Sequence, residues 1–174
     1  MHADNDNQQS DLFAEKSPEE LTKDRYKAAR KAAYHLLSRR EYSARELSER
    51  LLDKGHEAGI IAALLDDLKR ENLQNDHRFA EAYCRSRQHK GFGPLRIKQE
   101  LQQKGIDAEL INQTLNDCDE PWEQWIETVR VKRFGHQLPR DSKSIAKQIR
   151  FLQYRGFPPE LVHWLMRHGA EFAE

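Results

Sequence analysis

The feature that most constrains the fold of this chain is an internal repeat with a period of about 50 residues. When the sequence is shifted by 50 positions, Tyr42-Ser43 falls on Phe92-Gly93, and Lys54-Gly55 falls on Lys104-Gly105. Apolar positions coincide as well, and the aligned pairs are Leu47 with Ile97, Leu51 with Leu101, Ile61 with Ile111, and Leu65 with Leu115. The 174 residues therefore contain consecutive copies of one small unit.

A third copy follows the second at a shift of 51 positions, where Gly105 meets Gly156. This copy is the loosest, because Gln148 occupies the position of the apolar Ile97. A unit of roughly 50 residues buries too little surface to be stable by itself. We therefore expect successive units to pack against one another in an elongated, curved array.

Helical periodicity and helix-capping residues recur in every copy. In the middle copy, Asp76 is the expected N-cap of one helix, and Gly91-Phe92-Gly93-Pro94 separates that helix from the next. Gly105 ends the second helix of this copy, and Ser142 is the expected cap of the equivalent helix in the third copy. No segment alternates with the period of a strand. These signals predict an all-α protein.

The first predicted helix has an unusually complete start signal. Ser17-Pro18-Glu19-Glu20 supplies an N-cap, a proline at the first helical position and a capping-box glutamate. The helix is expected to run to about Ser38 and to bury Leu21, Ala29, Ala32, Ala33, Leu36 and Leu37. Residues 1–16 are polar, acidic and without periodicity, which predicts a disordered tail. The predicted organisation is this tail followed by three tandem three-helix repeats at 17–75, 76–119 and 120–174.

Charge is distributed in blocks along the chain. The 29 Lys and Arg residues balance the 29 Asp and Glu residues, so the formal net charge is zero. Acidic character dominates residues 1–24, basic character dominates 25–40, 78–104 and 130–155, and residues 107–127 contain no Lys or Arg. Alternating blocks give a molecule charged faces that its mean charge conceals.

Motifs that carry catalysis are absent from the sequence. There is no phosphate-binding GxxxxGK[ST] segment, and the glycine-rich corner ends in Pro94, which has no N–H to donate. His163 and His168 are five positions apart, so they do not share a helical face, and neither HExxH nor CxxC occurs. We therefore expect no catalytic residue, no metal and no cofactor.

The sequence also predicts the compartment. Cys84 and Cys118 share no metal or redox spacing, and each occupies a position where a small apolar residue would serve. No apolar run approaches the length of a membrane span, and the amino terminus lacks a basic start followed by an apolar segment. We therefore expect a reduced cytoplasmic protein without a disulfide framework or membrane contact.

Basic side chains form the candidate binding surface. In the middle copy they flank the corner that carries Phe92, and in the third copy they cluster between Arg130 and Arg155. Cations beside an aromatic ring can neutralise phosphates and stack bases, although Lys and Arg also cover ordinary solvated helices. The candidate partner-binding or DNA-binding residues are Arg85, Arg87, Lys90, Phe92, Arg96, Lys98, Lys132, Arg133, Lys143, Lys147 and Arg150. At helical spacing, Trp122, Trp125 and Trp164 are expected in the core instead.

The middle copy resembles the signature of the RecX regulatory proteins, which are bacterial modulators of the RecA recombinase. The residues that carry the resemblance are Asp76, Phe79-Ala80, Tyr83, Arg85, Arg87, Gly91, Gly93-Pro94, Arg96-Ile97, Glu100-Leu101 and Lys104-Gly105-Ile106. The likeness extends from roughly Tyr26 to Gly169, and it includes the three-unit plan and the Lys132-Arg133-Phe134-Gly135 stretch.

The resemblance implies a protein that is not an enzyme and that lies in the helical groove of the RecA–DNA filament. Such binding blocks filament extension or promotes disassembly, which lowers ATP hydrolysis, strand exchange and SOS coprotease activity. The implied partners are the RecA filament and single- and double-stranded DNA, and we expect the chain to be a monomer. The residues alone leave two other functions open, a helix-turn-helix transcriptional regulator and a protein-only helical-repeat adaptor.

Overall fold

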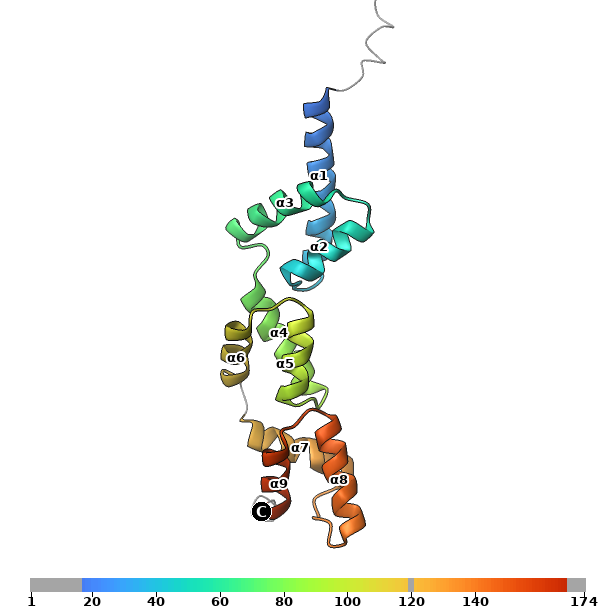
Figure 1. Ribbon diagram of the computed structural model, residues 1–174, viewed down its shortest axis with the longest axis vertical. Coiled ribbons are helices and arrows are strands. Elements are labelled where there is room, and N and C mark those ends of the chain that lie inside the picture. The colour runs from blue at the N-terminus through green and yellow to red at the C-terminus, as the bar shows by residue number, and fades with distance from the viewer. Residues whose placement is uncertain (1–16, 119–120, 169–174) are drawn as a thin grey trace, which may run out of the picture.

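The computed structural model describes residues 17–118 and 121–168, which form an elongated all-α array (Figure 1). Three units of three helices follow one another along the long axis, as the repeat predicted, and no strand occurs in the described ranges. The first unit contains α1 (Pro18–Leu37), α2 (Ala44–Asp53) and α3 (Ala58–Arg70), the second α4 (Asp76–His89), α5 (Pro94–Gln103) and α6 (Ala108–Asn116), and the third α7 (Trp122–Phe134), α8 (Ser142–Tyr154) and α9 (Pro159–His168). The predicted tail, residues 1–16, lies outside the described residues.

Several predicted helix ends are confirmed by their hydrogen bonds. Ser17 and Glu20 form the reciprocal capping box at the start of α1, and the Ser43 hydroxyl accepts a hydrogen bond from the Glu46 N–H at the start of α2. Gly105 follows the end of α5 with a φ of +78°, in the left-handed region where glycine has no Cβ to clash. Local sequence therefore determines where these helices start and stop.

Two predicted N-caps were wrong by one residue. Asn75 caps α4, since its side-chain oxygen accepts from the His77 and Arg78 N–H groups, and Asp76 is already helical. Asp141 caps α8 in place of Ser142. In both cases two good capping residues are adjacent, so the sequence alone did not distinguish between them.

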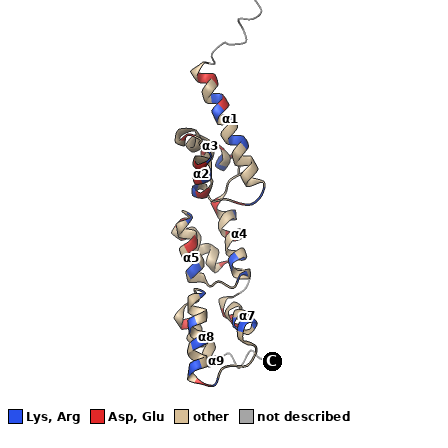
Figure 2. Ribbon diagram, turned by 90° about the vertical axis from the view of Figure 1, so that its right-hand side faces the viewer, with Lys and Arg blue, Asp and Glu red and all other residues tan. Residues whose placement is uncertain are grey.

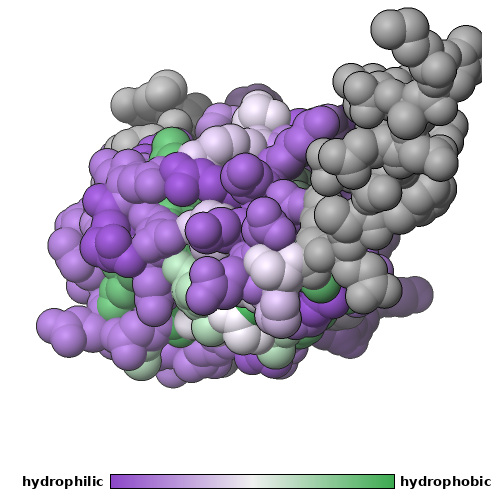
Figure 3. Space-filling model, turned by 90° about the horizontal axis from the view of Figure 1, so that it is seen from above, coloured by the Kyte–Doolittle hydropathy of each residue, from purple (hydrophilic) through white to green (hydrophobic). Residues whose placement is uncertain are grey.

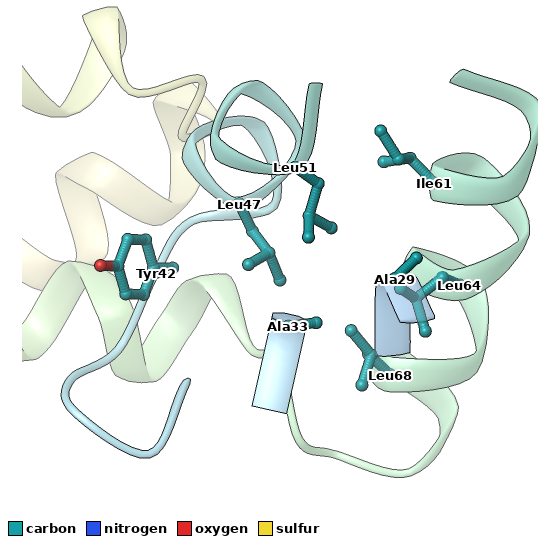
Figure 4. Packing of buried hydrophobic residues seen from close by; sticks show 8 residues of the cluster. All are labelled: Ala29, Ala33, Tyr42, Leu47, Leu51, Ile61, Leu64 and Leu68. Atoms are coloured by element: carbon teal, nitrogen blue, oxygen red, sulfur yellow. The ribbon is translucent and has the colours of Figure 1, made fainter. Parts of the chain in front are cut away.

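Each unit has its own hydrophobic core. In the first unit, Leu47 and Leu51 of α2 point toward Ile61, Leu64 and Leu68 of α3, with the small side chains of α1 between them (Figure 4). Buried clusters of the same kind fill the second and third units. The alignment of apolar positions in the repeat thus corresponds to three separate cores of similar construction.

The prediction that Leu21 is buried was wrong, because its side chain is 41% exposed. The first turns of α1 extend beyond the rest of the first unit, where no other helix covers them (Figure 1). In contrast, Trp122, Trp125 and Trp164 pack partly buried against the third core, as predicted.

Seen from the end at which α1 begins, the surface of the array is mostly hydrophilic, and hydrophobic residues are scattered over it (Figure 3).

Candidate functional site

The units meet through the same part of the repeat at both junctions. At the first junction, between the first and second units, the Ser43 hydroxyl donates to the Lys104 carbonyl at 2.8 Å. At the second junction, between the second and third units, the equivalent Gly93 N–H donates to the Arg155 carbonyl at 2.9 Å. The start of one middle helix therefore contacts the end of the next middle helix in each case.

The first junction is supported by further polar contacts. The Ala44 N–H donates to the Asp76 carboxylate at 2.9 Å, and the Gln74 side chain donates to the Tyr42 carbonyl at 3.1 Å. Lys104 adds an ion pair to the opposite unit through Glu46, at 3.2 Å. The residues that sequence analysis assigned to helix starts thus also join the units.

The second junction requires glycine on both sides. The Leu95 N–H donates to the Gly156 carbonyl at 3.0 Å, which brings the two backbones together. A Cβ atom on Gly93 would lie 2.5 Å from the Gly156 carbonyl oxygen, and one on Gly156 would lie 2.4 Å from the Arg96 Cβ. These distances are far below normal contact, so neither position accepts a side chain without displacing the opposite unit.

Three arginines surround Phe92 at the second junction. The guanidinium carbons of Arg87, Arg96 and Arg155 lie 5.0, 4.3 and 5.2 Å from the Phe92 ring centroid. Arg155 also donates to the Lys90 carbonyl at 2.8 Å. Cations over a ring face are attracted by its quadrupole. We call these four side chains, with Glu100, the Phe92 cluster.

Glu100 is the carboxylate of the Phe92 cluster. Its side chain is 16% exposed, and its oxygens accept from Arg87 Nε at 2.6 Å and Arg96 Nε at 3.2 Å. Burial opposes ionisation of Glu100, but the hydrogen bonds from Arg87 and Arg96 outweigh burial, so its pKa lies below the ordinary value of 4.5. Of the three guanidinium groups in the cluster, Arg87 and Arg96 pair with this carboxylate and Arg155 does not, so the cluster carries excess positive charge.

The lowered pKa of Glu100 predicts a pH dependence of stability. Folded Glu100 binds its proton less readily than the unfolded chain, so the ionised group stabilises the native state at neutral pH. This contribution is lost as the pH falls below 4.5 toward the folded pKa. In urea unfolding, Glu100→Gln should have a lower free energy of unfolding than the wild-type protein at pH 7, and this difference should become smaller in acid. Glu49→Gln, at a side chain that is 59% exposed, is the control and should show little deficit at either pH.

The remaining candidates of the second unit do not join the Phe92 cluster. Arg85 lies on another side of α4, where it lines a small pocket between α4 and α6. Lys98 donates to the Asn112 side chain of α6 at 3.3 Å. The second-unit candidates therefore fall into two groups, of which only Arg87, Lys90, Phe92 and Arg96 lie together at the second junction.

The third-unit candidates are exposed on α7 and α8, where blue segments mark Lys and Arg (Figure 2). Lys143, Lys147 and Arg150 follow one another at helical spacing on α8, and Lys132 and Arg133 lie near the end of α7. None of the five forms an ion pair within the described ranges. These cations are therefore available to an external anion.

Two basic residues of the third unit have roles that sequence analysis did not assign. Arg130 is completely buried, so its inclusion in a surface cluster was wrong. It pairs with Glu127 at 2.7 Å, and it donates to three backbone carbonyls just beyond α7. Arg155 is part of the Phe92 cluster, and its position beside Gly156 was the available signal, because Lys104 precedes Gly105 in the same way.

Open grooves lie on both sides of α5. The groove between α5 and α8 has a volume of about 470 Å³ and is lined by Leu95, Arg96 and the 78%-exposed Tyr154. The groove between the first and second units has a volume of about 500 Å³, with Tyr83, Lys104 and several carboxylates in its wall. Each groove runs beside one junction, so a bound partner can contact two units at once.

Metal and membrane features are missing from the part of the chain that the structure describes. No group of three His, Cys, Asp or Glu side chains is placed there to hold a metal ion. No helix in the same residues has the length and apolar character needed to cross a membrane.

Sequence models of the RecX family match all three units. The first three-helix domain of RecX matches residues 29–68, the second matches 75–115, and the third matches 123–166. Each match covers one of the three-helix units described above.

Proteins named "Regulatory protein RecX" are similar over most of this chain. The protein from Halorhodospira halophila is 42% identical over 135 residues, which are 78% of this chain and 84% of the relative. The protein from Pseudomonas entomophila is 39% identical over 139 residues, with coverage of 80% and 90%. The protein from Acinetobacter baylyi is 42% identical over 133 residues, with coverage of 76% and 82%.

Solved structures share the fold at lower sequence identity. The crystal structure of RecX from Lactobacillus salivarius has a TM-score of 0.71 at 23% identity, and the match covers 83% of this chain and 96% of that one. A second crystal structure, of regulatory protein RecX, has a TM-score of 0.71 at 21% identity, with coverage of 88% and 79%. Together with the matches of all three domains and the identities above, these findings show that the chain belongs to the RecX family of regulatory proteins.

Proposed function

We propose that this protein is a negative modulator of RecA that acts without being an enzyme. It binds in the groove of the RecA–DNA filament as a monomer, in the cytoplasm, and blocks filament extension or promotes disassembly. ATP hydrolysis, strand exchange and SOS coprotease activity fall as a consequence. Membership of a regulatory family supports the role of regulator, and the details of the RecA mechanism are proposals.

The observation that carries this proposal is the elongated stack of three like units (Figure 1). A filament presents the same subunit again and again along its groove, and three units joined by equivalent junctions present similar surfaces at regular spacing. The two junctions use the same corner of the repeat, through Ser43 in one and Gly93 in the other. Such a body can span neighbouring filament subunits instead of contacting one.

The charges support contact with a nucleoprotein surface. Exposed cations on α7 and α8 have no carboxylate partner in the described residues, so phosphates or acidic side chains of a partner can pair with them. The excess positive charge of the Phe92 cluster borders the groove between α5 and α8. The exposed cations lie on the third unit, and the Phe92 cluster lies at the junction of the second and third units.

The direct test is ATP hydrolysis by RecA on single-stranded DNA, with this protein added at well below one copy per RecA. Loss of hydrolysis at such ratios, with DNA in excess, places the action on the filament. Inhibition that requires saturation of the DNA would contradict the proposal, because the protein would then compete for strands as a general nucleic-acid binder.

Charge reversal on α8 is expected to weaken this inhibition. The triple variant Lys143→Glu, Lys147→Glu and Arg150→Glu changes exposed residues on one helical stripe, and the fold should tolerate it. Its affinity for the RecA–DNA filament should fall, with a salt dependence less steep by about one unit for each lost phosphate contact. Salt titrations of fluorescently labelled filaments measure both quantities.

A matched control variant distinguishes an effect of the α8 surface from an effect of the net charge of the protein. Lys23→Glu, Lys27→Glu and Lys31→Glu produce the same change in net charge on an exposed stripe of α1. An equal loss of affinity in both triple variants would mean that net charge decides binding and that the α8 surface has no special role.

A further inference from the structure

The two cysteines of the chain lie in contact, although 34 positions separate them. Cys84 is in the middle of α4 and is 2% exposed, while Cys118 follows the end of α6 and is partly buried. Their sulfur atoms are 3.2 Å apart, because α4 and α6 pack against each other in the second unit. No motif in the sequence predicts this contact.

The pair needs little movement to form a covalent bond. A disulfide has an S–S distance of about 2.05 Å, so the two sulfurs must approach by only about 1 Å. Cys118 follows the helix end instead of lying within it, so side-chain rotation and a small backbone shift supply this movement.

Solvent reaches the pair through a small pocket of about 90 Å³. Both cysteines line the pocket together with His77, Glu81, Arg85 and Asp117. Reversible oxidation to a disulfide requires access for the oxidant, which converts one thiol to a sulfenic acid, and a second thiol nearby that reacts with this first product. This pocket admits a molecule of the size of hydrogen peroxide, and it opens where both sulfurs lie.

We infer that Cys84 and Cys118 form a reversible oxidation site for peroxides. The more accessible Cys118 loses its thiol proton, and the thiolate attacks one oxygen of hydrogen peroxide, which breaks the O–O bond and leaves a sulfenic acid on Cys118. The hydroxide that is released takes up that proton and becomes water. The Cys84 sulfur then attacks the Cys118 sulfur, and the thiol proton leaves with the displaced hydroxyl group as water. Two thiols are oxidised to one disulfide, and one peroxide is reduced to two waters.

The bond would fasten the end of the second unit. Cys118 directly follows Asp117, the C-cap of α6, so the disulfide ties α4 to the end of α6. A crosslink between α4 and the end of α6 restricts the unfolded chain, and the oxidised protein should therefore have a higher Tm than the reduced protein. This inference does not depend on the proposed action on RecA.

The experiment uses the full-length protein, reduced and then freed of reductant. After treatment with hydrogen peroxide, remaining thiols are alkylated and the intact mass is measured without reduction. The expected result is simultaneous loss of both alkylatable thiols, a peptide linking Cys84 to Cys118, and full recovery with dithiothreitol. Oxidation of Cys118 to a sulfinic acid without a crosslink, or a disulfide formed only between two chains, would overturn the inference.

Two controls test whether the disulfide forms because the fold holds the two thiols together or because the thiols are reactive in any conformation. In Cys84→Ser, sulfenic acid should form on Cys118 and persist or overoxidise, whereas in Cys118→Ser the buried Cys84 should react slowly. In denaturing urea, the wild-type crosslink should form about tenfold more slowly, because the two thiols are no longer held together. Crosslinking at the same rate in urea would show that the contact in the second unit has no influence.

Discussion

Gly156→Ala is expected to separate the third unit from the second, whereas Gly55→Ala is expected to leave the array intact. Both glycines follow the middle helix of a unit and have positive φ values, +91° and +85°, so both substitutions incur similar backbone strain. They differ in their surroundings. The added Cβ at position 156 would lie 2.4 Å from the Arg96 Cβ, while nothing lies within 4 Å of the added Cβ at position 55.

The strain alone costs about 1–2 kcal/mol of stability at either position. At Gly156 the clash adds about 1–3 kcal/mol while the junction stays closed, and we expect the junction to open in response. Urea unfolding measures the cost, and small-angle X-ray scattering measures the maximum dimension. We expect a broader distance distribution for Gly156→Ala only. Equal scattering and equal stability of the two variants would mean that close contact of the backbones does not hold the junction.

Arg130→Ala is expected to be the most destabilising change at a charged residue of the third unit. The side chain is fully buried, pairs with Glu127, and donates to the carbonyls of Gly135, His136 and Gln137. Its removal leaves the carboxylate of Glu127, which is 15% exposed, and three backbone carbonyls without their donor. Breaking a buried pair from one side costs about 3–5 kcal/mol.

Urea unfolding of Arg130→Ala and Arg133→Ala provides the comparison. Arg133 is on the same helix, three residues away, but it is exposed, so its loss should change stability by less than about 0.5 kcal/mol. Arg130→Lys should lie between them, because an ammonium keeps the charge but cannot make the forked contacts of a guanidinium. A cost for Arg130→Ala no larger than for Arg133→Ala would show that the buried hydrogen bonds contribute no net stability.

The location of the candidate residues illustrates what a sequence pattern can predict. Exposure of Lys143, Lys147 and Arg150 followed from their spacing opposite the apolar positions of α8. The same reasoning placed Arg130 on the surface, although the backbone after α7 folds back over it. That course depends on Gly135 and the following segment, and helical periodicity carries no information about it. Whether the exposed candidates bind DNA or RecA stays a prediction.

The sequence by itself determined the local elements and their repetition. The apolar spacing, the caps at Ser17 and Ser43 and the glycine stops specify the helices that the structure describes within residues 17–118 and 121–168, and their order in three like units, because each of these signals acts within a few residues. Only the tertiary structure decided the contacts between distant positions, among them the three arginines around Phe92 and the touching sulfurs of Cys84 and Cys118. These depend on how whole helices pack, since small changes in the crossing of two helices move side chains that are far apart in sequence into or out of contact.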